Sequence, residues 1–212
     1  YIYFNRIYIK LYNDILNKYT MYTRNTFRKR FNIRNDDVDN DKEEETSDER
    51  IEVLNNAIYF YTEITGDTAF KLRIELQKLI TKHLIMNITH SLSEPIPIYL
   101  HINSPGGELH HALAIVDVIL GSEVPIYTVI EGEAVSAATL ISVVGHKRYI
   151  NKNAHMLIHQ LSSGCWGKMC EIEDEMENLT DFMEKIKQIY IDNTKIPKKE
   201  LTELLKHDLW LN

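Results

Sequence analysis

Three residues that together could cleave an acyl bond follow one another along the chain: Ser136, His159 and Asp208. A serine hydroxyl is a poor nucleophile until a neutral imidazole accepts its proton, and a carboxylate then holds that imidazole in place. The order of the three residues therefore predicts a nucleophile, a base and an orienting acid. The residue types alone are weak evidence, because a chain of 212 residues contains many of each.

The surroundings of these residues add to the prediction. Ser136 follows a glycine turn at Gly132 and opens a run of small apolar residues that is typical of a buried helix. His159 ends the short apolar strand expected over residues 155–159, and Asp208 follows a charged helix. Each residue also has a plainer interpretation: a serine that caps its own helix, a histidine buried in the core, and an aspartate that pairs with Lys206 or neutralises a helix end.

A glycine loop upstream could supply the remaining part of such a site. The alternation of apolar residues from Ile98 to Ile102 predicts a strand, and the turn sequence 103–107 ends in two glycines. A helix is expected from Leu109 to Leu120, closed by Gly121. A strand, a glycine turn and a helix start present free backbone N–H groups, which acyl transfer needs for an oxyanion.

The elements that would position these residues alternate between strand and helix. Strands are expected over 58–61 and 124–130, and a helix capped by Asp67 or Thr68 should lie between the first of them and residue 98. Such alternation predicts an α/β fold of βαβ units around a mainly parallel sheet.

At these residues the sequence resembles the ClpP-type (caseinolytic) serine peptidases, over about residues 57–212. The resemblance implies that Ser136 is the nucleophile, His159 the base and Asp208 the orienting acid. It also implies that the N–H groups of Gly107 and Ala137 form the oxyanion hole. Four blocks in the right order carry it: Ile102-Asn-Ser-Pro-Gly-Gly107, Gly132-Glu-Ala-Val-Ser-Ala-Ala138, Met156-Leu-Ile-His-Gln160 and His207-Asp-Leu-Trp-Leu211.

The same resemblance implies a crotonase-like ClpP fold with a long handle helix, and a double ring of identical subunits around the sites. Leu161 and Ser162 would pair with the backbone of a bound peptide, and Glu108 would face the same groove. An acid that interacts with the start of its own helix is an equal alternative for Glu108. The segment before Ile58 departs from the family region that meets an AAA+ unfoldase, so the resemblance does not extend to that partner.

A long acidic helix carries one apolar seam. Its members step by three and four residues, as a helix face that packs on a partner requires. The resemblance makes this helix the handle that joins two rings, and packing within its own domain is the alternative. The seam comprises Ile172, Met176, Leu179, Met183, Ile186 and Tyr190.

Composition excludes several other classes. The net charge of −7 argues against general nucleic-acid binding, and the sequence shows no apolar stretch long enough to span a membrane. Cys165 and Cys170 have no second pair for a zinc site and indicate a reducing compartment, either the cytoplasm or an organelle matrix. The adjacent His110 and His111 point about 100° apart on a helix, so we expect no metal, and the chemistry needs no cofactor.

The first 50 residues differ from the rest. A basic, acid-poor run is followed by an acidic run with few apolar residues, which indicates a disordered N-terminal extension. A targeting segment or a partner-binding arm are the alternatives for the basic run. Residues 51–212 are expected to form the peptidase domain, with an incomplete C-terminal edge.

The resulting hypothesis is a serine endopeptidase that hydrolyses peptides or unfolded proteins through an acyl-enzyme. One alternative is a non-catalytic ClpP-like ring subunit with a structural or adaptor role. The related crotonase-type acyl-CoA enzymes are a second alternative, against which the ordered serine, histidine and aspartate argue.

Overall fold

The computed structural model describes residues 50–162, 164–206 and 209–211. The predictions for the N-terminal extension up to residue 49 and for Asp208 fall outside these ranges. Within the described residues, no helix combines the length and the apolar content that a membrane crossing needs.

One sheet organises the described residues, and its strands run in the order β1-β2-β3-β4-β6-β7, with β5 also paired to β4. The pairs β2–β3, β3–β4, β4–β5 and β4–β6 are parallel, whereas β1 and β7 pair antiparallel to their neighbours. The expected βαβ units with a mainly parallel sheet are therefore confirmed. The bounds are β1 Arg50–Leu54, β2 Ala57–Tyr61, β3 Ile98–Ser104, β4 Ile126–Val135, β5 Lys147–Ile150, β6 His155–Ile158 and β7 Leu209–Leu211.

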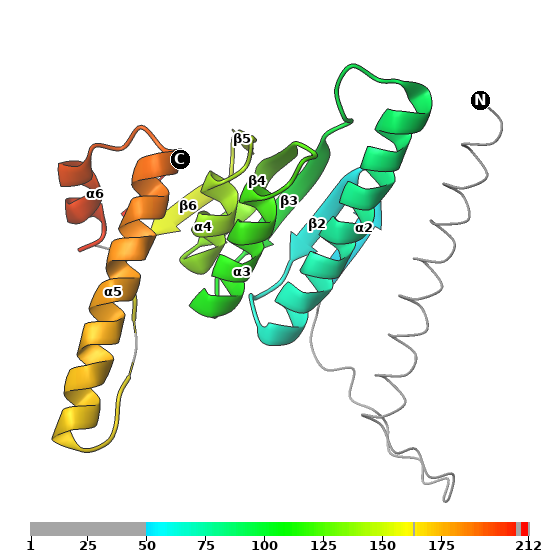
Figure 1. The fold of residues 1–212 in the computed structure, drawn as a ribbon. Coiled ribbons are helices and arrows are strands. Elements are labelled where there is room, and N and C mark those ends of the chain that lie inside the picture. Colours follow the sequence, from blue (N-terminus) through cyan, green and yellow to red (C-terminus); the bar gives the residue numbers. More distant parts are fainter. Residues whose placement is uncertain (1–49, 163, 207–208, 212) are drawn as a thin grey trace, which may run out of the picture. The chain divides into compact units, whose positions relative to one another are not determined.

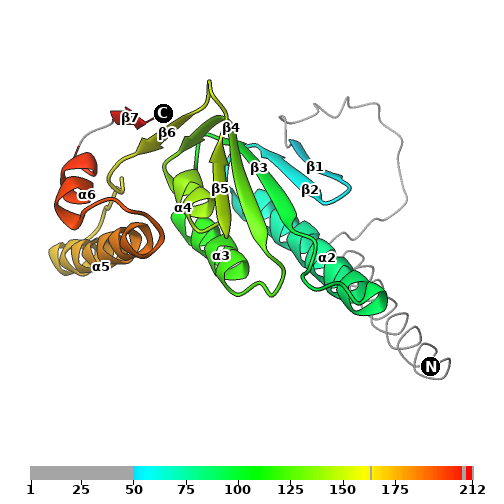
Figure 2. The ribbon, with the colours of Figure 1, turned by 90° about the horizontal axis from the view of Figure 1, so that it is seen from above.

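Helices follow the strands as a βαβ fold requires. Figures 1 and 2 show α2, α3 and α4 on one face of the sheet, while α5 stands beyond β6. The predicted α/β class and the long helix near the C-terminus are both present. The bounds are α2 Gly66–His90, α3 Leu109–Leu120, α4 Ala137–Val143, α5 Met169–Asn193 and α6 Lys198–Leu204.

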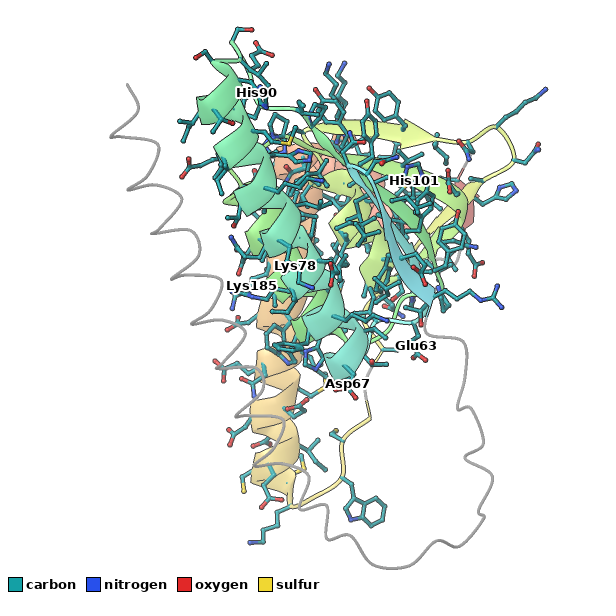
Figure 3. All side chains as sticks on the ribbon, turned by 90° about the vertical axis from the view of Figure 1, so that its right-hand side faces the viewer. Glu63, Asp67, Lys78, His90, His101 and Lys185 are labelled. Carbon is teal, nitrogen blue, oxygen red and sulfur yellow. The ribbon has the colours of Figure 1, made fainter. Side chains whose placement is uncertain are left out.

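The core lies between the sheet and these helices. Ile98, Leu100 and Ile102 alternate along β3 and are each at most 1% exposed. The opposite face of the same strand carries half-buried Tyr99 and His101. Figure 3 shows His101 on the side of the strands away from α2. One face of the sheet is thus apolar and covered by helices, and the other is aromatic and polar.

The polar face contains one connected hydrogen-bond group. The Glu131 carboxylate accepts hydrogen bonds from the Tyr61 hydroxyl and from His101 Nδ1, the latter at 2.8 Å. Burial alone would raise the pKa of Glu131, but these hydrogen bonds outweigh it and hold the pKa below its usual value. Burial and the same carboxylate raise the pKa of Tyr61 to about 12.

The start of α2 corrects one detail of the sequence prediction. The capping residue is Thr65, not Asp67 or Thr68. The Thr65 hydroxyl accepts the Thr68 N–H at 3.2 Å, and the Thr68 hydroxyl accepts the Thr65 N–H at 2.8 Å. Because a cap needs an extended backbone and both later residues already lie in the helix, only Thr65 can fill the position.

The apolar seam on α5 is buried unevenly. Ile186 and Tyr190, near its C-terminal end, are 6% and 2% exposed. Met176, more than two helical turns toward the N-terminus, is 57% exposed. Packing within the chain therefore buries the C-terminal end of the seam and leaves Met176, toward its N-terminal end, exposed.

Candidate active site

Ser136 occupies a sharp turn between β4, which ends at Val135, and α4, which begins at Ala137. Its backbone has φ 54° and ψ −123°, a left-handed conformation that residues with a Cβ rarely adopt. The Ser136 N–H donates to the Leu157 carbonyl at 2.9 Å, which ties the turn to β6. The Ser136 side chain makes no capping hydrogen bond to α4, so the plainer interpretation as a helix cap does not hold.

This arrangement has a chemical use. A strand that passes abruptly into a helix through one strained residue pushes the side chain of that residue out of the layer, as in the nucleophile elbow of α/β-hydrolases. Every residue of α4 is buried, which holds the helix start rigidly under the serine. The elbow can therefore present a hydroxyl at a fixed point.

The buried hydroxyl groups of Thr139 and Tyr190 form a chain of contacts that ends at the Ser136 carbonyl. The Ser136 carbonyl accepts hydrogen bonds from the Thr139 N–H at 3.0 Å and from Thr139 Oγ1 at 2.5 Å. Thr139 Oγ1 also lies 2.5 Å from the hydroxyl of Tyr190 on α5. Sequence analysis did not assign a role to Thr139, and it treated Tyr190 only as part of an apolar seam.

The glycine loop lies directly against this elbow. A Cβ added to Gly106 would lie 2.5 Å from the Val135 carbonyl oxygen, 2.9 Å from Ser136 Cβ and 3.3 Å from the Ala137 nitrogen. The φ of Gly106 is +94°, which also favours glycine. Only a residue without a side chain lets these two backbone segments approach so closely.

The orientation of Gly107 follows from its neighbours. The Ile64 N–H donates to the Gly106 carbonyl at 2.7 Å, and the Glu108 N–H donates to the Ile64 carbonyl at 2.8 Å. Gly107 thus forms a parallel bridge with Ile64. Because the Gly106 carbonyl faces Ile64, the Gly107 N–H at the other side of the same peptide group points away from Ile64. The second predicted donor, the N–H of Ala137, belongs to the first turn of α4 and so has no partner within that helix.

His159 comes next to Ser136 through the register of the sheet. Val135 pairs with Leu157 in the parallel β4–β6 ladder, so the residues just after these two positions leave the sheet at the same edge. Ser136 and His159 both line one cavity of about 270 Å³. The structure thus brings together the predicted nucleophile and base, although they are 23 positions apart in the sequence (159 minus 136).

The third predicted residue, Asp208, lies outside the described residues. Its neighbour Leu209 begins β7, which pairs antiparallel with β6, and Leu209 lies opposite Ile158. The described part of the chain therefore returns to the strand that leads into His159.

The cavity walls come from four regions of the chain. These regions are the glycine loop with the start of α3, the start of α4, the segment after β6, and α5. The predicted substrate-contact residues Glu108, Leu161 and Ser162 all belong to this lining. The contribution of α5 was missed, because the seam indicated a packing surface and not a cavity wall. It comprises Glu175, Leu179, Phe182, Ile186 and Tyr190.

The histidines near α3 have separate partners. His110 packs edge-on against Phe182 with ring centroids 4.9 Å apart, and His111 Nε2 lies 3.2 Å from Glu108 Oε2. Within the described ranges, no three His, Cys, Asp or Glu side chains gather in a way that could hold a metal ion.

Comparison with known proteins places the chain in a family. A sequence profile described as Clp protease matches residues 52–212. One similar protein is the ATP-dependent Clp protease proteolytic subunit 2 of Treponema denticola, 36% identical over 140 residues that cover 65% of this chain and 69% of the relative. The protein of the same name from Treponema pallidum is 32% identical over 127 residues, which cover 59% of this chain and 64% of the relative.

The chain thus spans about two thirds of the length of these relatives, as the shares of 69% and 64% show. The matched range contains Ser136, His159, both glycines of the loop and the whole of the cavity lining. The profile covers more than half of the 212 residues and coincides with the described α/β fold. The chain belongs to the Clp protease family.

Proposed function

We propose that the protein is a serine endopeptidase that hydrolyses peptide bonds of peptides or unfolded proteins through an acyl-enzyme. The observation that carries the proposal is the elbow at Ser136, which shares one cavity with His159 and touches the Gly106–Gly107 loop. A strained, non-capping serine beside the backbone N–H groups of Gly107 and Ala137 has no evident purpose in packing.

The reaction divides among the residues of this cavity. His159 accepts the proton of Ser136 while Ser136 Oγ attacks the peptide carbonyl, and the carbonyl oxygen takes up negative charge. The N–H groups of Gly107 and Ala137 donate hydrogen bonds to that oxygen. His159 then gives its proton to the leaving amine. A water molecule next attacks the acyl-enzyme and passes a proton to His159, which returns it to the Ser136 oxygen as the acid product leaves. Loss of one such oxyanion donor typically lowers turnover by about 10²–10³.

Asp208 completes the proposal as the residue that orients His159. The support is the antiparallel pairing of Leu209 with Ile158. In the sequence, His159 directly follows Ile158 and Asp208 directly precedes Leu209. Because loss of an orienting carboxylate is usually milder than loss of the nucleophile, Asp208→Asn should lower turnover less than Ser136→Ala.

Substrate recognition is proposed to rely on backbone contacts. Leu161 and Ser162 follow β6 and line the cavity, where an extended peptide could pair with the main chain. Such contacts read few side chains, so we expect broad sequence tolerance. Glu108 also lines this cavity and would face the peptide.

The assembly proposed for this chain is a double ring of identical subunits joined through α5. The exposed N-terminal part of its seam supports this, since Met176 is 57% exposed in the single chain. The relatives are named as proteolytic subunits of an ATP-dependent protease. An AAA+ unfoldase is not part of this proposal, because the segment before Ile58 does not resemble the family region that would meet it.

Active-site labelling tests the catalytic proposal. A fluorophosphonate probe should attach to Ser136, as seen by mass spectrometry of the labelled peptide, and Ser136→Ala should abolish both the label and the cleavage of a short fluorogenic peptide. Ser162→Ala is the matched control, because Ser162 lines the same cavity without the elbow geometry, and it should still be labelled. An unlabelled but fully assembled wild-type ring would favour the alternative, a ring subunit with a structural or adaptor role.

A further inference from the structure

The strained elbow is connected to α5 by a short chain of buried hydrogen bonds. Thr139, 0% exposed, uses both its N–H and its hydroxyl to bond the Ser136 carbonyl. A threonine hydroxyl has one proton, and that proton is donated to Ser136. The Tyr190 hydroxyl, 2.5 Å from Thr139 Oγ1, is then the donor to Thr139.

Tyr190 is suited to remain a donor. It is 2% exposed, and burial raises the pKa of its phenol to about 12. The phenol therefore stays protonated at every pH at which a peptidase of this kind would work. Its position is fixed by packing as well, since Tyr190 belongs to the buried C-terminal end of the α5 seam.

The bond to the Ser136 carbonyl has a consequence one atom further along the backbone. The carbonyl of Ser136 and the N–H of Ala137 belong to the same planar, trans peptide group, so they point in opposite directions. A hydrogen bond that fixes the carbonyl on one side therefore also fixes the direction of the N–H on the other side. The Ala137 N–H is one of the two donors in the proposed oxyanion hole.

We propose that Thr139 and Tyr190 are positioning residues for the reaction. The sequence of bonds from Tyr190 to Thr139 to the Ser136 carbonyl holds the Ser136–Ala137 peptide plane so that the Ala137 N–H faces the cavity. This inference rests on the proposed function, because it needs a developing oxyanion at that point. It assigns to these two residues a role in transition-state stabilisation that acts through the Ser136–Ala137 peptide group.

Four variants test this role with a fluorogenic peptide as the substrate. Thr139→Val removes the hydroxyl at nearly constant volume and should lower kcat about 5- to 10-fold with little change in KM, since the lost contribution concerns the transition state. Tyr190→Phe keeps the ring, leaves the Thr139 hydroxyl less fixed, and should lower kcat about 2- to 5-fold. Thr139→Ser retains the hydroxyl and should return kcat to near the wild-type value. Because the two residues act as one unit, the Thr139→Val, Tyr190→Phe double variant should be no slower than Thr139→Val alone.

Ser142→Ala is the matched control. Ser142 is also buried in α4, 3% exposed, and its hydroxyl donates to the Thr139 carbonyl at 2.8 Å, away from the elbow. This variant should lose stability to a similar extent without a selective loss of kcat. If Thr139→Val does not fold, Tyr190→Phe and its comparison with Ser142→Ala still decide the question.

Two outcomes separate this inference from the proposed function. If the wild-type protein is not labelled by the fluorophosphonate, the proposed function fails. If it is labelled, but Thr139→Val and Tyr190→Phe keep the wild-type kcat, the catalytic proposal stands and the positioning role is wrong. Additive losses in the double variant, or an equal loss in Ser142→Ala, would also overturn the positioning role, because they would indicate a general effect on stability.

Discussion

The helices α4 and α5 form two sides of the same cavity and differ in how the chain holds them. All seven residues of α4 are buried, whereas α5 buries only Ile186 and Tyr190 among its 25 residues. The short helix therefore has its position set by contacts on every side, and the long one is anchored at one end. The proposed nucleophile and one proposed oxyanion donor thus stand at the start of the helix that is buried on every side, whereas the exposed part of α5 is the surface proposed to meet a second subunit.

The largest expected effect is on kcat, and it should differ between a substitution at the start of α4 and one on α5. Ser136→Ala, at the entry of α4, should reduce kcat by about 10³-fold or more, because removal of a nucleophile leaves only the binding and oxyanion terms. Glu175→Gln, on the α5 wall, should change kcat by less than about 3-fold, since Glu175 lines the cavity without a part in the bond changes. Steady-state kinetics of the two variants against the wild type provides the measurement. Comparable losses of kcat in both would contradict the division proposed for the two walls.

A second prediction concerns stability. Leu140→Ala, in α4 and 2% exposed, should lower the free energy of unfolding by about 2–5 kcal/mol, because a buried cavity is left behind. Met176→Ala, in α5 and 57% exposed, should change the free energy of unfolding by less than about 0.5 kcal/mol in a dilute single chain. Denaturant unfolding at low protein concentration measures both. A large loss in Met176→Ala under these conditions would mean that the exposed half of α5 packs on its own chain.

A third prediction concerns Leu179, a half-buried member of the seam that also lines the cavity. Leu179→Asp places a carboxylate among apolar neighbours and should cost at least about 1–3 kcal/mol if a second subunit covers that surface. Light scattering should then report a smaller particle. Thr180→Asp adds the same charge at the next, exposed position and serves as the control, with an unchanged mass expected. If Leu179→Asp also leaves the mass unchanged, the seam at Leu179 is not part of a contact between subunits.

The smallest predicted effect is on how the free energy of unfolding depends on pH through Tyr190, at the buried end of α5. Burial raises the pKa of Tyr190 from an ordinary value of 10.0 to about 12, so the unfolded chain loses this proton more readily than the folded one. The contribution of the protonated Tyr190 phenol to the free energy of unfolding is complete below pH 10 and is lost as the pH rises toward 12. Tyr190→Phe should make the free energy of unfolding fall less steeply over this window than it does in the wild type. Tyr149→Phe, at an exposed ring, should leave that slope unchanged.

Local signals in the sequence predicted the elements that carry the site. The glycine turn and Gly121 delimit α3, which runs from Leu109 to Leu120 as expected. The strand ahead of it begins at Ile98, also as expected. Ser136 and His159 were proposed from their residue types and their neighbours in the sequence. The cavity that they share depends on the register between β4 and β6. A local sequence pattern does not report that register, whereas the family resemblance implies it.

Other features depend on contacts between distant residues and were not predicted. The β1 strand was not assigned, because its alternation is short and its turn to β2 depends on a left-handed Asn55 with φ 57°. The contact between Thr139 and Tyr190 joins residues 51 positions apart, and no periodicity along either helix reports it. The cavity wall formed by α5 was missed for the same reason, since a seam shows which face is apolar and not what that face encloses.

The left-handed backbone of Ser136 implies that the protein gives up some thermodynamic stability to keep this residue. A side chain at φ 54° costs about 1–3 kcal/mol relative to a relaxed conformation, and glycine would avoid most of that cost. Among inactive variants, Ser136→Gly should therefore melt at a higher temperature than Ser136→Ala, because alanine keeps the strain and glycine relieves it. A random search for greater heat resistance would tend to select changes that silence the site, and selection for activity would be needed to prevent it.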